Sequence, residues 1–116
     1  FPSYYSGMIQ TDIDKLPEEV IIDGDIETLE VYVNGNFLRI EPSQKVHNHS
    51  SQFNWGFGGS GSAQLALAIL MKFMDEQSAH KYHQPFKFKV VASWKQGEDF
   101  EVRINLRAIM SELIKQ

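Results

Sequence analysis

The chain of 116 residues is 42% hydrophobic and 22% charged, which is the composition of one folded domain and excludes wholesale disorder. It contains no cysteine, which excludes disulfides, thiolate metal sites and cysteine nucleophiles, and its longest apolar run, residues 65–71, is too short to cross a bilayer. The formal net charge of −4 and a pI near 5.5 argue against a nucleic-acid-binding surface.

The first part of the chain is strongly acidic. Eight Asp or Glu side chains accompany a single lysine in the first 30 residues. We interpret residues 1–28 as an acidic leader and residues 29–116 as a single α+β domain. Within the leader, residues 16–27 favour either a short helical turn or an extra edge strand. A targeting segment upstream of Phe1 would not be visible, and a cytoplasmic location is the default expectation.

A β-hairpin is predicted over residues 29–41. Apolar and polar residues alternate on both sides of Asn34-Gly35, the dipeptide that best tolerates the positive φ angles of a two-residue turn. Pro42 ends this hairpin, and residues 43–61 then form a long loop rich in Ser, Asn, His and Gly. Loops of this length inside a compact domain are usually functional or packed on themselves.

A helix that is apolar on all sides is predicted after the loop, over residues 62–77. Its Ala, Leu, Ile and Met residues favour helix, and Ser60 or Gly61 is placed to cap its first amides. Before its acidic end, only Gln64 and Lys72 are polar, so this helix must be covered on every side. We expect the sheet to cover one side and the C-terminal helix or a second subunit to cover another.

The rest of the chain is predicted to form a short helix, a second hairpin and a final helix. The short helix, through Tyr82, should stop before Pro85. Apolar and polar residues then alternate over residues 86–94 and 100–104, which is typical of two strands covered on one face. Asn105 would cap the final helix. The order β-β-α-(α)-β-β-α predicts an α+β fold, with an antiparallel sheet of about four strands and helices packed on one face.

Three glycines within residues 55–61 fit the G-x-G-x-x-G pattern of dinucleotide-binding loops. The preceding residues, 47–55, are polar and too short for a buried strand, and residues 78–90 hold no acid to bind a ribose. We therefore expect no cofactor. Instead, the glycines should let the backbone turn sharply past packed aromatic rings, with Trp55 and Phe57 as anchors.

The same stretch resembles the signature of an uncharacterised bacterial and phage domain family, N-H-S followed by W-G-Y-G-G-S-G-P-A-Q-L-A-L-A-I-L. The matching residues are 48–50 and 55–70, with Ser62 where the family usually has proline. The resemblance extends from the first hairpin to the last helix and implies a domain rather than an activity. We take as the candidate binding loop Asn48, His49, Ser50, Trp55, Phe57, Gly58, Gly59, Ser60 and Gln64.

The four histidines raise the question of a metal site. They occur as two pairs, His47-x-His49 and His80-x-x-His83, which could in principle supply four imidazole ligands. No carboxylate or thiolate lies beside them at a diagnostic spacing. We therefore expect exposed histidines and no bound metal.

A small hydrolase or anion-binding protein is the alternative function. His49 would act as the base and Ser50 or Ser60 as the nucleophile, while amides at the start of the apolar helix would stabilise an oxyanion or hold an anion. No G-x-S-x-G elbow is present. A catalytic His49 must line a cleft, whereas a structural one should be buried and hydrogen-bonded.

Lysines and aromatic residues alternate over residues 86–94 and could form a surface for single-stranded nucleic acid. On a strand, however, the rings would face the core and the lysines the solvent. We therefore predict a small non-catalytic protein-interaction module, from a phage or mobile-element context by resemblance. It would act through the candidate loop on an unknown protein partner and can form a homo-oligomer.

Overall fold

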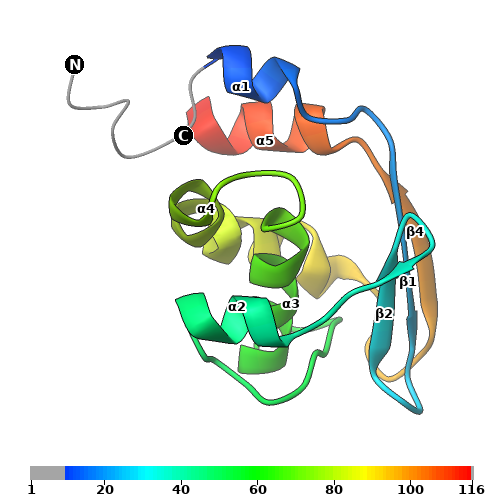
Figure 1. Ribbon diagram of the computed structural model, residues 1–116. Coiled ribbons are helices and arrows are strands. Elements are labelled where there is room, and N and C mark those ends of the chain that lie inside the picture. Colours follow the sequence, from blue (N-terminus) through cyan, green and yellow to red (C-terminus); the bar gives the residue numbers. More distant parts are fainter. Residues whose placement is uncertain (1–9, 116) are drawn as a thin grey trace.

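The protein has two layers, a four-stranded antiparallel sheet and helices packed on one of its faces (Figure 1). The structure, a computed structural model, describes residues 10–115, so the first nine residues of the predicted acidic leader lie outside the described part. The predicted α+β fold is confirmed. The elements are α1 (Gln10–Asp14), β1 (Val20–Asp25), β2 (Glu30–Val33), β3 (Asn36–Phe37), α2 (Glu41–Val46), α3 (Ser60–Leu70), α4 (Glu76–Lys89), the 3-10 helix η2 (Val91–Ser93), β4 (Phe100–Ile104) and α5 (Leu106–Lys115).

The sheet has the strand order β3-β2-β1-β4, which makes β1 an inner strand. Val20 and Ile22 alternate with less buried neighbours and are themselves fully buried. Residues 16–27 were expected as a helical turn or an edge strand. The strand found there is inner because β2 and β4 pair with its two sides. The sheet therefore starts before residue 29, where the domain was expected to begin.

The hairpin between β2 and β3 turns at Asn34-Gly35, as predicted. Both residues have positive φ, 51° and 80°, and Tyr32 pairs with Phe37 across the turn. The second strand is only two residues long. Pro42 does end the strand region, but it does so in the first turn of α2, where a proline needs no backbone N–H partner. Part of the predicted long loop is therefore helical.

Helix α3 lies in the middle of the helical layer (Figure 1), and residues 61–70 are all buried. The prediction of an apolar helix covered on every side is confirmed, although the helix is shorter than predicted. Helices α2 and α4 pack against it. The C-terminal helix α5 packs mainly against α1 and α4, so α2 and α4, rather than α5, supply the main helical cover of α3.

The end of helix α4 and the 3-10 helix η2 lie where a strand was predicted over residues 86–94. Helix α4 begins with Asp75 as its N-cap and continues through Pro85 to Lys89. Its buried residues recur at helical spacing, as at Ala79, Tyr82 and Phe86. The predicted stop before Pro85 and the second hairpin are therefore wrong, and within residues 10–115 β4 pairs with β1 alone.

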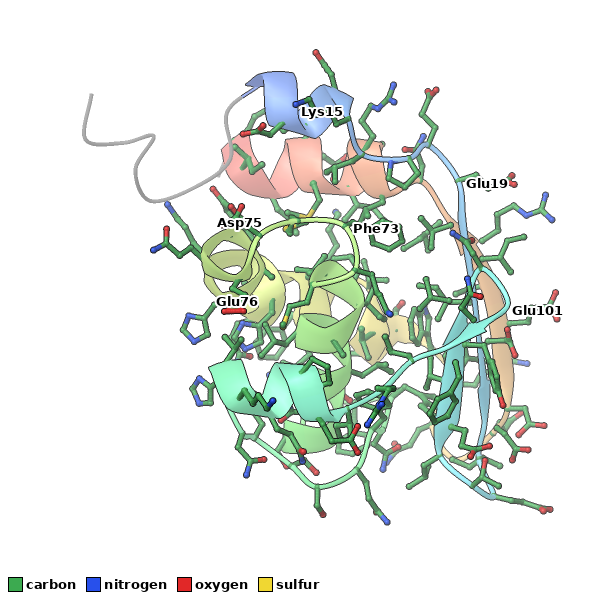
Figure 2. The ribbon with its side chains drawn as sticks, viewed as in Figure 1. Lys15, Glu19, Phe73, Asp75, Glu76 and Glu101 are labelled. Atoms are coloured by element: carbon green, nitrogen blue, oxygen red, sulfur yellow. The ribbon has the colours of Figure 1, made fainter. Side chains whose placement is uncertain are left out.

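The face of the sheet opposite the helices is polar. Glu19 and Glu101 point away from the helical layer (Figure 2). Asp23 lies directly opposite Glu101 in the β1–β4 pairing. The candidate loop is on the other side, among the helices, so its residues do not contribute to this acidic face.

Candidate functional site

Gln64 is the polar centre of the candidate loop. It is fully buried in the second turn of α3, yet its amide has partners on both atoms. Its Oε1 accepts hydrogen bonds from the backbone N–H groups of His49 (2.6 Å) and Ser50 (3.1 Å), and its Nε2 donates to Ser43 Oγ (2.8 Å). Because a buried amide is costly unless paired, this set of bonds ties the loop and α2 to α3.

Trp55 anchors the far end of the loop. Its side chain is fully buried, its Nε1–H donates to the Glu98 carbonyl (2.8 Å), and its ring meets Phe100 edge to face at 4.7 Å. The next residue, Gly56, has φ +83° and donates its N–H to Val91 O (3.0 Å). A Cβ there would collide with the backbone of Gln96. Only glycine fits, so the predicted sharp turn beside packed aromatic groups is present.

The start of α3 differs from the prediction. Its N-cap is Gly59, and no side chain caps the helix. The Phe57 ring lies directly on Gly59, where a Cβ would not fit. Ser60 is exposed, whereas Ser62 is buried, and its Oγ has no hydrogen-bond partner among the described residues. Neither Ser60 nor Gly61 acts as the cap, because the helix begins one residue earlier than the predicted caps allow.

Lys87 and Phe88 of α4 complete the outer side of the glycine loop. Lys87 is only 6% exposed, and its Nζ donates to Gly58 O (3.1 Å) and lies 3.9 Å from the centroid of the Phe88 ring. Burial lowers the pKa of Lys87. Phe88 is 64% exposed. The expectation of buried rings and exposed lysines is wrong here because neighbouring residues on a helix do not alternate between two faces.

The four histidines lie together, although the two pairs are more than 30 residues apart in the chain. His47 Nδ1 is 3.1 Å from His80 Nε2, and His49 Nε2 is 2.9 Å from His83 Nε2. The rings of His47 and His49 stack at 3.9 Å. His47 and His80 are exposed, but His83 is only 2% exposed, so the expectation of exposed histidines is wrong for the inner pair.

The electrostatics of the cluster favour neutral rings in the inner pair. Burial, partly offset by the hydrogen bond to the His80 carbonyl and reinforced by nearby His49, His80 and His47, lowers the pKa of His83 to about 4. Burial also lowers the pKa of His49, with smaller contributions from His47, Lys87 and His80. Within residues 10–115, no three His, Cys, Asp or Glu side chains are arranged to hold a metal ion. The N–N distances instead suit hydrogen bonds between imidazoles.

The predicted site residues fall into two groups. Those that hold the loop in place from inside are His49, Ser50, Trp55 and Gln64. Those at the outer side or start of the helix are Asn48, Phe57, Gly58, Gly59 and Ser60. The sequence reasoning missed Ser43, considered His83 only as a metal ligand, and placed Lys87 and Phe88 on a strand. The helical spacing of apolar residues from position 79 to 86 could have placed the last three correctly.

The hydrolytic arrangement is not assembled. The Nε2 atom of His49 contacts His83, and the Ser50 hydroxyl accepts from Gln52 N–H at 3.2 Å. Among the described residues, no hydrogen bond joins His49 to the hydroxyl of Ser50 or Ser60. His49 is half-buried and hydrogen-bonded, which matches the structural role stated for it above more closely than the catalytic one.

Comparisons with known proteins place the chain in an uncharacterised domain family. No helix in the described part of the chain is both long and apolar enough to span a membrane. No curated protein and no solved structure matches the chain. The model of a family of unknown function, DUF6166, matches residues 22–115, from the first buried strand to the last helix. The chain therefore belongs to the DUF6166 family.

Proposed function

We propose that this domain is a small non-catalytic protein-interaction module that contacts its partner through the outer side of the glycine loop. We call this the loop surface and define it as Phe57, Gly58, Ser60 and Phe88. The observation that carries the proposal is the 64% exposure of Phe88, a large apolar ring. Exposed aromatic residues of this size are enriched where proteins bind one another.

The loop surface is held in shape before any partner arrives. A Cβ on Gly58 would lie 2.9 Å from the Phe88 ring, so the glycine allows the ring to lie close to the loop. Lys87 fixes the two segments by donating to Gly58 O while its Nζ faces the same ring. A preorganised aromatic residue loses little conformational entropy on binding. This favours Phe88 as the anchor of a contact surface.

The alternative hydrolase receives no comparable support. His49 and Ser50 use their backbone N–H groups to hold the loop on Gln64. The acidic pI also argues against a surface for nucleic acid. The family resemblance extends the proposal to a bacterial or phage setting.

The experiment compares Phe88→Ala with Phe37→Ala in affinity purification from cells of the native host. Phe37 is the matched control because it is the other large apolar side chain exposed in the described residues, at 48%. A partner that is lost with Phe88→Ala and retained with Phe37→Ala supports the proposal. Retention of every partner by Phe88→Ala would exclude the loop surface. Light scattering on both variants tests whether the partner is a second copy of the chain.

A further inference from the structure

We propose that the four histidines form an acid-sensitive latch. At neutral pH the latch holds the end of α2 and residues 47–49 against α4, and in acid this contact opens while Gln64 keeps the loop on α3. The latch rests on the histidine cluster alone and does not require the proposed interaction function. It proposes that pH controls how the loop is attached to α4, a property that no sequence pattern indicated.

The latch joins the end of α2 and residues 47–49 to α4. His47 and His49 follow the end of α2, and His80 and His83 lie one turn apart on α4. The two contacts, His47 to His80 and His49 to His83, are therefore parallel links between the same two segments. Each link needs one ring nitrogen that carries a proton and one that does not.

The direction of the inner hydrogen bond follows from a neighbouring contact. His83 Nδ1 lies 2.6 Å from the carbonyl oxygen of His80, which can only accept, so Nδ1 must carry the proton. The Nε2 of a neutral His83 is then a lone-pair acceptor, and His49 Nε2–H donates to it at 2.9 Å. A second proton on His83 would occupy Nε2, and the link would then need His49 to accept at its own Nε2, with its proton on Nδ1. A proton on both rings places two N–H donors against each other and breaks the link.

The charged groups around the cluster do not compensate such a proton. On the loop and α4, the groups that act on the inner pair are His47, His80 and Lys87, all of which are neutral or cationic. Facing them, α3 contributes the uncharged Gln64. Helix α2 carries Lys45 in its last turn, and its acid, Glu41, is in the first turn. Lys81 adds a further cation on α4.

One acid lies beside the outer pair. Glu76, at the start of α4 (Figure 2), lines a shallow groove with Val46 and His80. The groups named above that act on the inner pair include no acid. The inner pair is therefore the acid-sensitive part of the latch.

The pH range follows from the inner pair. Since the pKa of His83 in the folded protein is about 4, below the ordinary value of 6.5, the native state favours the neutral ring. The contribution of the link is fully present above pH 6.5 and declines as the pH falls from 6.5 towards 4. The latch should thus open progressively in mildly acidic solution.

The experiment measures distances between spin labels in the full chain, which is simple because the chain has no native cysteine. Labels on Lys45→Cys and Gln77→Cys, both exposed, report the distance between α2 and α4. A second pair, on Lys45→Cys and Lys72→Cys, reports α2 against the end of α3. All samples contain EDTA, so that metal capture by the histidines cannot contribute.

We expect the population with a longer 45–77 distance to rise about thirtyfold from pH 7.5 to pH 5, while the 45–72 distance stays unchanged. His83→Gln should abolish the rise, and His49→Gln serves the same purpose should the first variant fail to fold. An unchanged 45–77 distance in the wild type would overturn the proposal. So would a rise that persists in the folded histidine variant, or an equal change in both label pairs, which is the signature of general unfolding.

Discussion

Two attachments hold the start of the candidate loop, and they differ in chemistry. Gln64 fixes it to α3 through an amide that does not titrate, with bonds to the His49 and Ser50 amides. The inner histidine pair fixes the same segment to α4 through rings that can gain a proton. The difference teaches that one loop can have a permanent anchor and a conditional one. Both act on His49, the first on its backbone N–H and the second on its side chain.

The permanent anchor should give the largest effect. Gln64→Leu keeps the volume but removes the acceptor of two half-buried N–H groups, those of His49 and Ser50, and the donor to Ser43, so we expect a loss of about 4 kcal/mol in the free energy of unfolding. Urea denaturation at pH 8 measures it. Gln77→Leu, the same change at an exposed position, should cost less than about 0.5 kcal/mol. Equal effects at both positions would show that the Gln64 amide anchors nothing.

The far end of the loop is fixed by backbone geometry instead. Gly56→Ala combines a positive φ with a collision against Gln96, and we expect a loss of about 3 kcal/mol. Gly97→Ala is the matched control, since Gly97 also has a positive φ, +75°, but open space around it. It should lose only about 1 kcal/mol. Thermal unfolding of both variants measures the difference. Equal Tm values for Gly56→Ala and Gly97→Ala would contradict the importance of the collision with Gln96.

The conditional anchor should appear as a pH effect. Because the pKa of His83 falls from 6.5 in the unfolded chain to about 4 in the fold, the wild type should lose about 2 kcal/mol of stability between pH 8 and pH 5 through this group. His83→Gln lacks the titration, so its loss over the same range should be smaller by that amount. Urea curves at both pH values test the difference, in which other titrating groups cancel. If the wild type and His83→Gln lose the same stability between pH 8 and pH 5, the histidine pair is not a pH-dependent anchor.

A weaker tie to the same loop should give the smallest effect. Gln44 Nε2 donates to Ser50 O at 3.0 Å from a half-buried position. Since water can replace this donor, Gln44→Ala should cost about 0.5 to 1 kcal/mol at both pH 8 and pH 5. A loss as large as that of Gln64→Leu would mean that the anchor lies in α2 rather than in α3.

The parts of the fold that could be predicted are those encoded by neighbouring residues. Asn34-Gly35 needs only local backbone preferences to turn, and both residues have the positive φ expected of them. The apolar run of α3 demands burial whichever elements cover it. Asn105 likewise caps α5, with its Oδ1 accepting from Ala108 N–H at 3.0 Å.

Residues 76–94 show why other parts could not be predicted. Phe86, Phe88 and Val90 alternate as in a strand, and Pro85 is typical of a helix stop. Tertiary packing decides otherwise, because only a helix buries Phe86 together with Ala79 and leaves Phe88 outside. The same reason explains why the histidine cluster could not be predicted. His80 and His83 meet His47 and His49 only when α4 lies beside the end of α2, which no local pattern specifies.

The most direct test of the permanent anchor is residue-resolved amide hydrogen exchange at His49 and Ser50, measured by NMR at neutral pH. We predict that both amides exchange nearly as slowly as those in the middle of α3, and that Gln64→Leu makes them exchange rapidly while the fold persists. Rapid exchange of both amides in the wild type, at rates typical of an exposed loop, would contradict the central claim that this signature loop is fastened to the buried helix.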